Sequence, residues 1–309
     1  MIPQRLSTFG RGARLGFVRA CGELEGQARR VWWADGHPCC LVGLMNGIEL
    51  VTGSRRIFGG CRPPIFAAAA PARADGIVVV HQDPRGARVF TTSATRRVGE
   101  RVFNKEDLVG AHLATDGFCV VLAARGGVSR FADWTLRSRM EWSLAPLQNA
   151  LGETQAIVRG LHDLEDALLL ETAAGWSRWS WGGRMLAAWP APAACRVAAW
   201  HDVTPLVYMP ARSAGGVPEL VAWDLASGPS RSFGPAFERP CVARSPDLRW
   251  LVVDRVARDG HGLELWDMAE ARLVERLETG RQVHAMAFAA DGRSVAVATL
   301  RDLFVLCVA

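Results

Sequence analysis

The chain has 309 residues, of which 50% are apolar and 22% are charged, and its formal net charge is +5. This apolar content is enough for a substantial folded core. No apolar run reaches the roughly 18 residues that a membrane-spanning helix needs. Residues 1–20 carry scattered arginines without a continuous apolar centre, unlike a secretory leader. We therefore expect a single cytoplasmic domain over residues 1–309, with no membrane association.

The sequence predicts short strands grouped into successive units along the whole chain. A strand-like segment at residues 13–20 comes first, and seven units follow. The first five cover about residues 28–57, 65–102, 108–147, 155–189 and 195–233, the sixth begins at Cys241, and the seventh covers about residues 281–309. Apolar runs of four to eight residues separated by turn residues are typical of buried strands.

An aspartate marks the first turn of every unit. The seven aspartates are spaced by 39 to 47 residues, and they are Asp35, Asp75, Asp116, Asp163, Asp202, Asp247 and Asp291. Four of them are followed by glycine, which accepts the positive φ of a tight turn. A regular period of 40 to 45 residues built from four strands is typical of a β-propeller blade.

Two Trp-Asp pairs, Trp223-Asp224 and Trp266-Asp267, end the third predicted strands of units five and six. On these residues and the period, the chain resembles the WD-repeat family. The resemblance implies an all-β, seven-bladed propeller of four-stranded blades, which strand 13–20 closes by pairing with residues 302–308. In that family a His, a Ser or Thr, an Asp and a Trp support each blade. In unit seven Arg281 stands at the His place and Asp302 at the Asp place, and no Trp follows.

A search for reactive groups favours a protein without catalytic activity. The pairs His162-Asp163 and His201-Asp202 lie at predicted first turns, where aspartate bends the chain. Trp179 and Trp181 are expected to pack between blades. The eight cysteines contain no CxxC pair and are interpreted as reduced, mostly buried thiols. We therefore assign no catalytic residues, metal or cofactor, and a metal-dependent hydrolase remains only a third hypothesis.

Binding through exposed turns is the favoured function, because loops on a rigid scaffold commonly carry recognition. Five arginines fall in or beside second turns and form a candidate partner-binding rim: Arg85, Arg125, Arg212, Arg258 and Arg301. Guanidinium groups suit carboxylates and phosphates. However, 35 of the 36 basic residues are arginines, which is typical of a GC-rich, bacterial genome, so about three of the seven turns would carry one by chance.

The leading hypothesis is a non-enzymatic protein-interaction scaffold that binds one or more proteins within a multi-subunit complex. Propellers of this divergent type resemble components encoded beside MoxR-type ATPases and von Willebrand A proteins. That resemblance implies a bacterial conflict, defence or regulatory system. The alternative is binding of nucleic acid or another polyanion by the arginine rim, which added salt would weaken steeply.

Overall fold

The fold is described here from a computed structural model of the chain. It describes residues 15–308 apart from residues 25–27, 35–36, 45–46, 52–54, 60–64, 70–75, 84–85, 94–96, 104–107, 114–119, 125–126, 132–138, 164–166, 192–194, 200–204, 210–217, 236–240 and 258–259. Between residues 34 and 107 the description is confined to the backbone of the strands.

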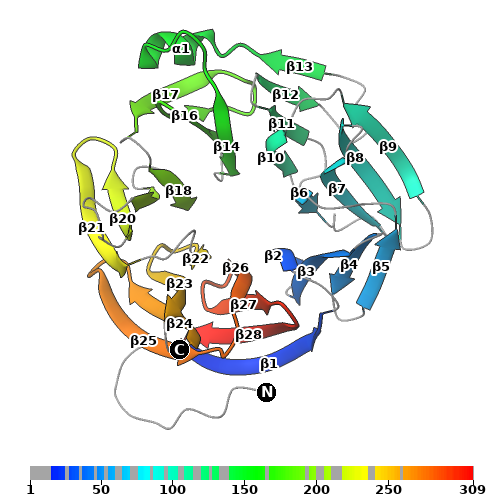
Figure 1. Ribbon diagram of the computed structural model, residues 1–309, viewed down its shortest axis with the longest axis vertical. Helices are drawn as coiled ribbons and strands as arrows, with labels where there is room; N and C mark the ends of the chain where they lie inside the picture. Colours follow the sequence, from blue (N-terminus) through cyan, green and yellow to red (C-terminus); the bar gives the residue numbers. More distant parts are fainter. Residues whose placement is uncertain are drawn as a thin grey trace. The chain divides into compact units, whose positions relative to one another are not determined.

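The described part of the chain is all-β except for one short helix, and it contains seven four-stranded antiparallel sheets (Figure 1). Sheets 1 to 3 comprise β2 (Ala28–Ala34), β3 (His37–Leu44), β4 (Gly47–Val51) and β5 (Arg55–Gly59); β6 (Ile65–Ala69), β7 (Gly76–Asp83), β8 (Gly86–Ser93) and β9 (Arg97–Phe103); and β10 (Leu108–Leu113), β11 (Val120–Ala124), β12 (Gly127–Phe131) and β13 (Arg139–Trp142).

Sheets 4 to 6 comprise β14 (Val158–Asp163), β15 (Leu168–Thr172), β16 (Gly175–Trp179) and β17 (Met185–Pro190); β18 (Arg196–Ala199), β19 (Leu206–Met209), β20 (Glu219–Asp224) and β21 (Gly228–Pro235); and β22 (Val242–Arg244), β23 (Trp250–Ala257), β24 (Gly260–Asp267) and β25 (Arg272–Glu278). In sheets 1 to 6 the strands pair in chain order, which is the meander of a propeller blade. The predicted all-β class and four-stranded units are confirmed.

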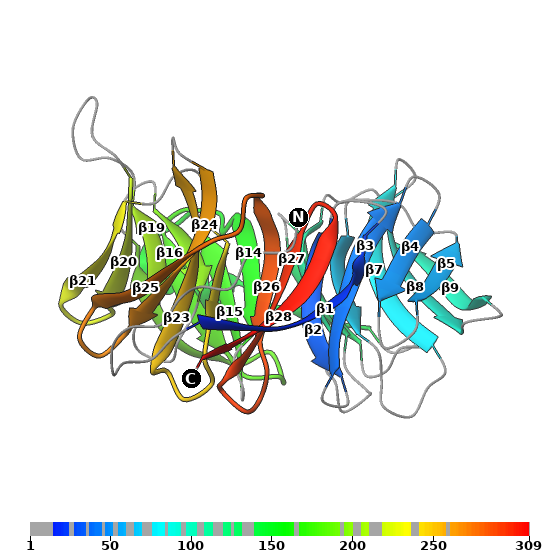
Figure 2. The same cartoon turned by 90° about the horizontal axis from the view of Figure 1, so that it is seen from below.

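Sheet 7 combines the two ends of the described chain. It comprises β26 (Val283–Phe288), β27 (Ser294–Thr299), β28 (Asp302–Val308) and β1 (Leu15–Glu23), in the pairing order β1, β28, β27, β26. β1 runs antiparallel to β28, from Leu15 opposite Val308 to Glu23 opposite Asp302. Figure 2 draws β1 in blue beside β28 in red. The predicted pairing of an N-terminal strand with residues 302–308 is confirmed, and the strand continues three residues beyond the predicted segment.

The chain divides into two compact units by its internal contacts. Unit 1 contains residues 1–44, 49–57 and 203–309, and unit 2 contains residues 45–48 and 58–202. Within unit 1, β26 lies against both β22 and β2, and Val252, Leu265, Val295 and Leu306 are fully buried in the core between sheets 6 and 7. Within unit 2, β10 lies against β6 and β14.

Trp179 in unit 2 packs between neighbouring sheets, as predicted. It is fully buried, its indole stacks on that of Trp142 with 5.5 Å between ring centroids, and its Nε1 donates to the Ser177 hydroxyl at 2.7 Å. Trp181 lies in the turn after β16 rather than on the strand, but it packs against the same core.

The third predicted unit ends differently from the prediction. Residues 145–147 belong to helix α1 (Ala145–Leu151) and not to a strand. Pro146 stands in the first helical turn, where its missing N–H costs nothing, and Gly152 ends the helix in the left-handed conformation with φ 69°. Leu147 anchors the helix in the core beside Trp142. Among the described residues, no helix is sufficiently long and apolar to span a bilayer.

Candidate functional site

Turns join the strands at the two ends of each sheet, and we name these ends, here called edges, by the strands that the turns join. The first-turn edge holds the turns from first to second and from third to fourth strand, and the second-turn edge holds the turn from second to third strand. In sheet 7, residues 289–293 precede β27 on the first-turn edge, and residues 300–301 follow β27 on the second-turn edge. An antiparallel meander places these two edges at opposite ends of its strands.

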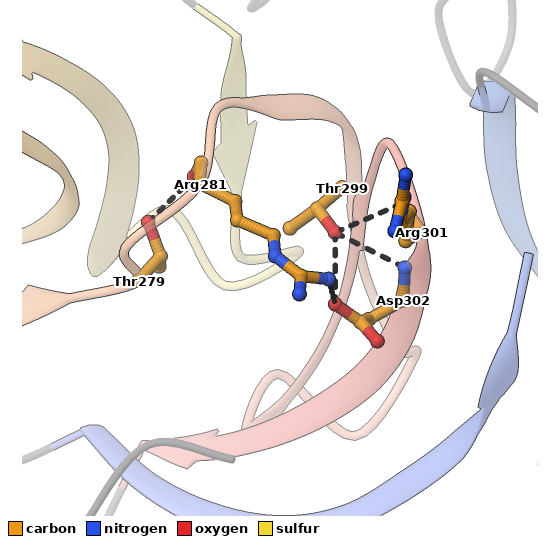
Figure 3. A network of polar contacts seen from close by, with 5 residues as sticks. All are labelled: Thr279, Arg281, Thr299, Arg301 and Asp302. Atoms are coloured by element: carbon orange, nitrogen blue, oxygen red, sulfur yellow. Dashed lines mark hydrogen bonds and ion pairs between the residues drawn. The ribbon is translucent and has the colours of Figure 1, made fainter. Parts of the chain in front are cut away.

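The second-turn edge of sheet 7 carries a polar network (Figure 3). Arg281 Nη1 donates to Asp302 Oδ2 at 2.5 Å, so the two residues compared above with the supporting His and Asp form a pair. The Thr299 hydroxyl accepts from the Asp302 N–H at 3.1 Å. The Thr279 hydroxyl donates to the Arg281 carbonyl at 2.8 Å. The pair is substantially exposed, at 39% and 46% of the two side chains, so it orders the turn more than it stabilises the fold.

Of the five predicted rim arginines, only Arg301 lies within the described residues. It is exposed beside the network, its N–H donates to the Thr299 hydroxyl at 3.4 Å, and its carbonyl accepts from the Leu24 N–H at 2.6 Å. Arg85, Arg125, Arg212 and Arg258 lie outside the described residues. The bounds of the second and third strands agree with the intervals predicted for all five, but a common basic rim stays a prediction.

A carboxyl group with a raised pKa lies between sheets 6 and 7. Burial raises the pKa of Asp254 on β23 to about 6, opposed by a hydrogen bond from the Val283 N–H of β26. Its Oδ1 is buried without a hydrogen-bond partner. Burial, and then the Asp254 charge, raise the pKa of the nearby Cys241 thiol to about 12. A thiol with this pKa is protonated at neutral pH and is therefore a poor nucleophile.

Aspartate side chains fix the turns on the first-turn edge. In sheet 7, Asp291 Oδ1 accepts from the N–H groups of Arg293 and Ser294, both at 2.8 Å, and its Oδ2 accepts from the Ser294 hydroxyl at 2.8 Å. In sheet 6, Asp247 Oδ1 accepts from the Ser245 hydroxyl at 2.5 Å and from the Arg249 N–H at 3.2 Å. The hydrogen bond from Ser245 is the main cause that lowers the pKa of Asp247.

A cleft of about 610 Å³ opens on the first-turn edge between sheets 6 and 7. Its lining residues are Asp247, Arg249, Trp250, Asp291, Gly292, Arg293, Cys307 and Val308. Arg249 lies over the indole of Trp250, with its guanidinium carbon 4.7 Å from the ring centroid. Arg293, the equivalent residue one repeat later, is exposed. The 44-residue period therefore places two arginines and two aspartates around one cleft.

The sequence did not single out this cleft, although it contained a signal. In the sequence Asp247 and Asp291 indicate only turns, and the signal is the arginine that stands two positions after each of them. The side-by-side placement of the two turns follows from sheet packing.

In unit 2, His162 pairs with Glu171 of the adjacent strand, with 3.3 Å between Nε2 and Oε2. Glu171 is buried, so the pair crosslinks β14 and β15. Burial, and then the Glu171 charge, raise the pKa of Cys195 to about 11, which keeps this thiol protonated. His201 and Asp202 lie outside the described residues. Within the described part, no three His, Cys, Asp or Glu side chains gather as a metal site.

No protein-family model matches the chain, and no curated protein matches it either.

Proposed function

We propose that the chain is a WD-like, seven-bladed β-propeller that serves as a protein-interaction platform without catalytic activity. The observation that carries this proposal is the repeated construction of the first-turn edge. Sheets 6 and 7 each hold the first turn by a hydrogen bond from the N–H two residues after the aspartate, and in both the residue that donates it is an exposed arginine. Turns fixed in this way lose little conformational entropy on binding, which favours recognition of a partner.

The chemistry of the described titratable groups supports binding rather than catalysis. The carboxylates of Asp247 and Asp291 are occupied by turn donors, and the thiols of Cys195 and Cys241 have raised pKa values. The one close His-Glu pair has a buried carboxylate and lies across two strands of one sheet. These groups act in packing and turn formation, and binding by exposed turns needs no further reactive residue.

The partner class follows from the fold by analogy and from the resemblance of the repeat. A propeller-like chain is compatible with a scaffold role, and a bacterial conflict, defence or regulatory complex is the setting that we propose for it. The alternative is polyanion binding by the second-turn arginines, but about three of the seven second turns would carry an arginine by chance in so arginine-rich a chain. We therefore rank it second.

The test is recovery of partners with the tagged protein from its native host, at low and high salt, with and without nuclease. We expect a defined protein that remains bound after nuclease treatment. Recovery of nucleic acid alone, or of proteins that nuclease releases, would transfer the proposal to the polyanion alternative. Recovery of no protein above an untagged control would contradict the platform.

A further inference from the structure

The two arginines of the first-turn cleft present unoccupied hydrogen-bond donors. Within the described residues, neither guanidinium forms an ion pair or a hydrogen bond, although both line the same cleft. Each arginine side chain carries five N–H donors in a planar fork. Arg249 is held over Trp250, which limits its rotamers before any ligand binds. The cleft is therefore rich in donors, and those of Arg249 are partly fixed in position.

The two aspartates of the cleft are largely satisfied by their own turns. Asp291 accepts three hydrogen bonds and Asp247 accepts two, all within their own turns. Burial raises the pKa of both carboxyls, but these bonds and the nearby charges of Arg249 and Arg293 favour the ionised form, so the pKa of each lies below its ordinary value. The aspartates shape the cleft and have few lone pairs left for a ligand, so the free chemistry is that of the arginines.

Gly292 borders the space between the two turns. It is buried with φ 66°, and a Cβ at this position would lie 3.7 Å from Asp247 Cγ. Cys307 and Val308 of β28 form a further part of the wall. A volume of about 610 Å³ lies within the usual range of roughly 300 to 1,000 Å³ for ligand sites, which is room for one or two side chains.

We propose that this cleft binds a carboxylate side chain on an acidic peptide segment of the partner protein, with Arg249 and Arg293 as the contacts. The inference rests on the proposed platform function and names the chemistry of its partner. A carboxylate accepts two parallel N–H bonds from one guanidinium. The site lies on the opposite edge of sheet 7 from Arg301, so it is separate from the predicted rim.

A peptide fits this cleft better than nucleic acid does. Single-stranded nucleic acids require aromatic faces on which bases stack. Trp250 is only 8% exposed and lies beneath Arg249, so its face is not available. A run of phosphates would also approach the ionised Asp247 and Asp291, whereas a single carboxylate can lie at the arginines alone.

The test measures binding of two fluorescein-labelled peptides that differ only in having glutamate or glutamine at four positions. We expect the full-length protein to bind the glutamate peptide saturably, and about tenfold more tightly than the glutamine peptide. The variant R249A/R293A should lose about tenfold in affinity for the glutamate peptide. Both substitutions retain the backbone N–H groups that bond Asp247 and Asp291, so the turns should persist.

The matched control is R272A/R276A, which removes two exposed arginines of sheet 6 that do not line the cleft. It should bind as the unaltered protein does. If the double variant unfolds, the single variant R293A tests the same cleft, because it leaves the stacked Arg249 in place. It should show a smaller loss.

Several outcomes would overturn the inference. These are equal binding of the two peptides, undiminished binding by R249A/R293A and R293A, an equal loss in the control, or no saturable binding. The protein could instead bind a single-stranded oligonucleotide more tightly than the glutamate peptide, and R249A/R293A could abolish that binding. This result would replace the inference by polyanion binding at the cleft. If one of these overturning results is found and a defined protein is still recovered from the host, the cleft assignment fails but the proposed platform function is retained. If no protein is recovered, the platform itself fails.

Discussion

Aspartate has the same structural role in three turns of the chain, at Asp224, Asp247 and Asp291. Each carboxylate accepts N–H groups two or three residues further on. Hydrogen bonds from the hydroxyls of Ser227 and Ser245 are the main cause that lowers the pKa of Asp224 and of Asp247, and the backbone N–H groups lower it further. In Asp291 burial raises the pKa, but the hydrogen bonds outweigh it and the pKa is lowered. A lowered folded-state pKa contributes stability above the unfolded value near 4, and this contribution is lost as the pH falls further. These turns therefore need ionised aspartates.

The residue after the turn aspartate differs between the repeats and predicts opposite effects of substitution. Leu248 and Gly292 occupy equivalent places with φ of 63° and 66°, a conformation that costs a non-glycine residue about 1 kcal/mol. We expect Leu248→Gly to leave stability unchanged or raise it, and Gly292→Ala to lower it by about 1 kcal/mol. Urea unfolding of both variants measures this. A clear loss in Leu248→Gly would show that its side chain outweighs the backbone strain.

Asp254 predicts a dependence of stability on pH opposite to that of the turn aspartates. Its folded-state pKa of about 6 lies above the unfolded value, so the folded protein binds the proton more tightly. Stability is thus lost as the pH rises from about 4 to about 6. Asp254→Asn keeps an acceptor for the Val283 N–H and removes the charge. We expect it to raise the free energy of unfolding at pH 7 by on the order of 1 kcal/mol, after allowance for solvent screening.

The measurement compares urea unfolding of Asp254→Asn and the unaltered protein at pH 4 and pH 7. The difference between the two proteins should be larger at pH 7. An equal difference at both pH values would contradict the assigned pKa.

Among the strands, β1 allows the most direct prediction about stability, because it completes sheet 7. Leu15 is 4% exposed and packs in the core between sheets 6 and 7, whereas Phe17 on the same strand is 41% exposed. We expect Leu15→Ala to lower the free energy of unfolding by about 2 to 4 kcal/mol. The control Phe17→Ala should cost less than about 1 kcal/mol. Similar small losses in both would mean that β1 is not anchored as described.

The elements also show what the sequence could and could not predict. The strands could be predicted from the sequence, because apolar runs, aspartate turns and a constant period agree with one another. For example, the predicted unit at residues 195–233 matches β18–β21. Helix α1 was missed, although Pro146 and Gly152 are ordinary helix-end signals, because seven residues are too short for a periodic pattern. The cleft was missed because its two halves are 44 residues apart and meet only through packing between sheets.

At the scale of the whole molecule, the predicted single domain has a thermodynamic test. If the two compact units belong to one closed propeller, Leu15→Ala in unit 1 should also destabilise strands of unit 2. We therefore expect β15 and β27 to unfold in one coincident transition. Hydrogen exchange of peptides from these two strands measures it. Separate midpoints, with β15 unaffected by Leu15→Ala, would instead indicate two independently folding units.

The most direct test of the platform is recovery of partners from the native host with three proteins: unaltered, R249A/R293A and R301A. The account predicts a defined, nuclease-resistant protein partner that binds the unaltered protein and R301A and is depleted with R249A/R293A. Recovery of nucleic acid alone, retained by R249A/R293A and lost with R301A, would contradict the account and favour the second-turn arginines as a polyanion-binding rim.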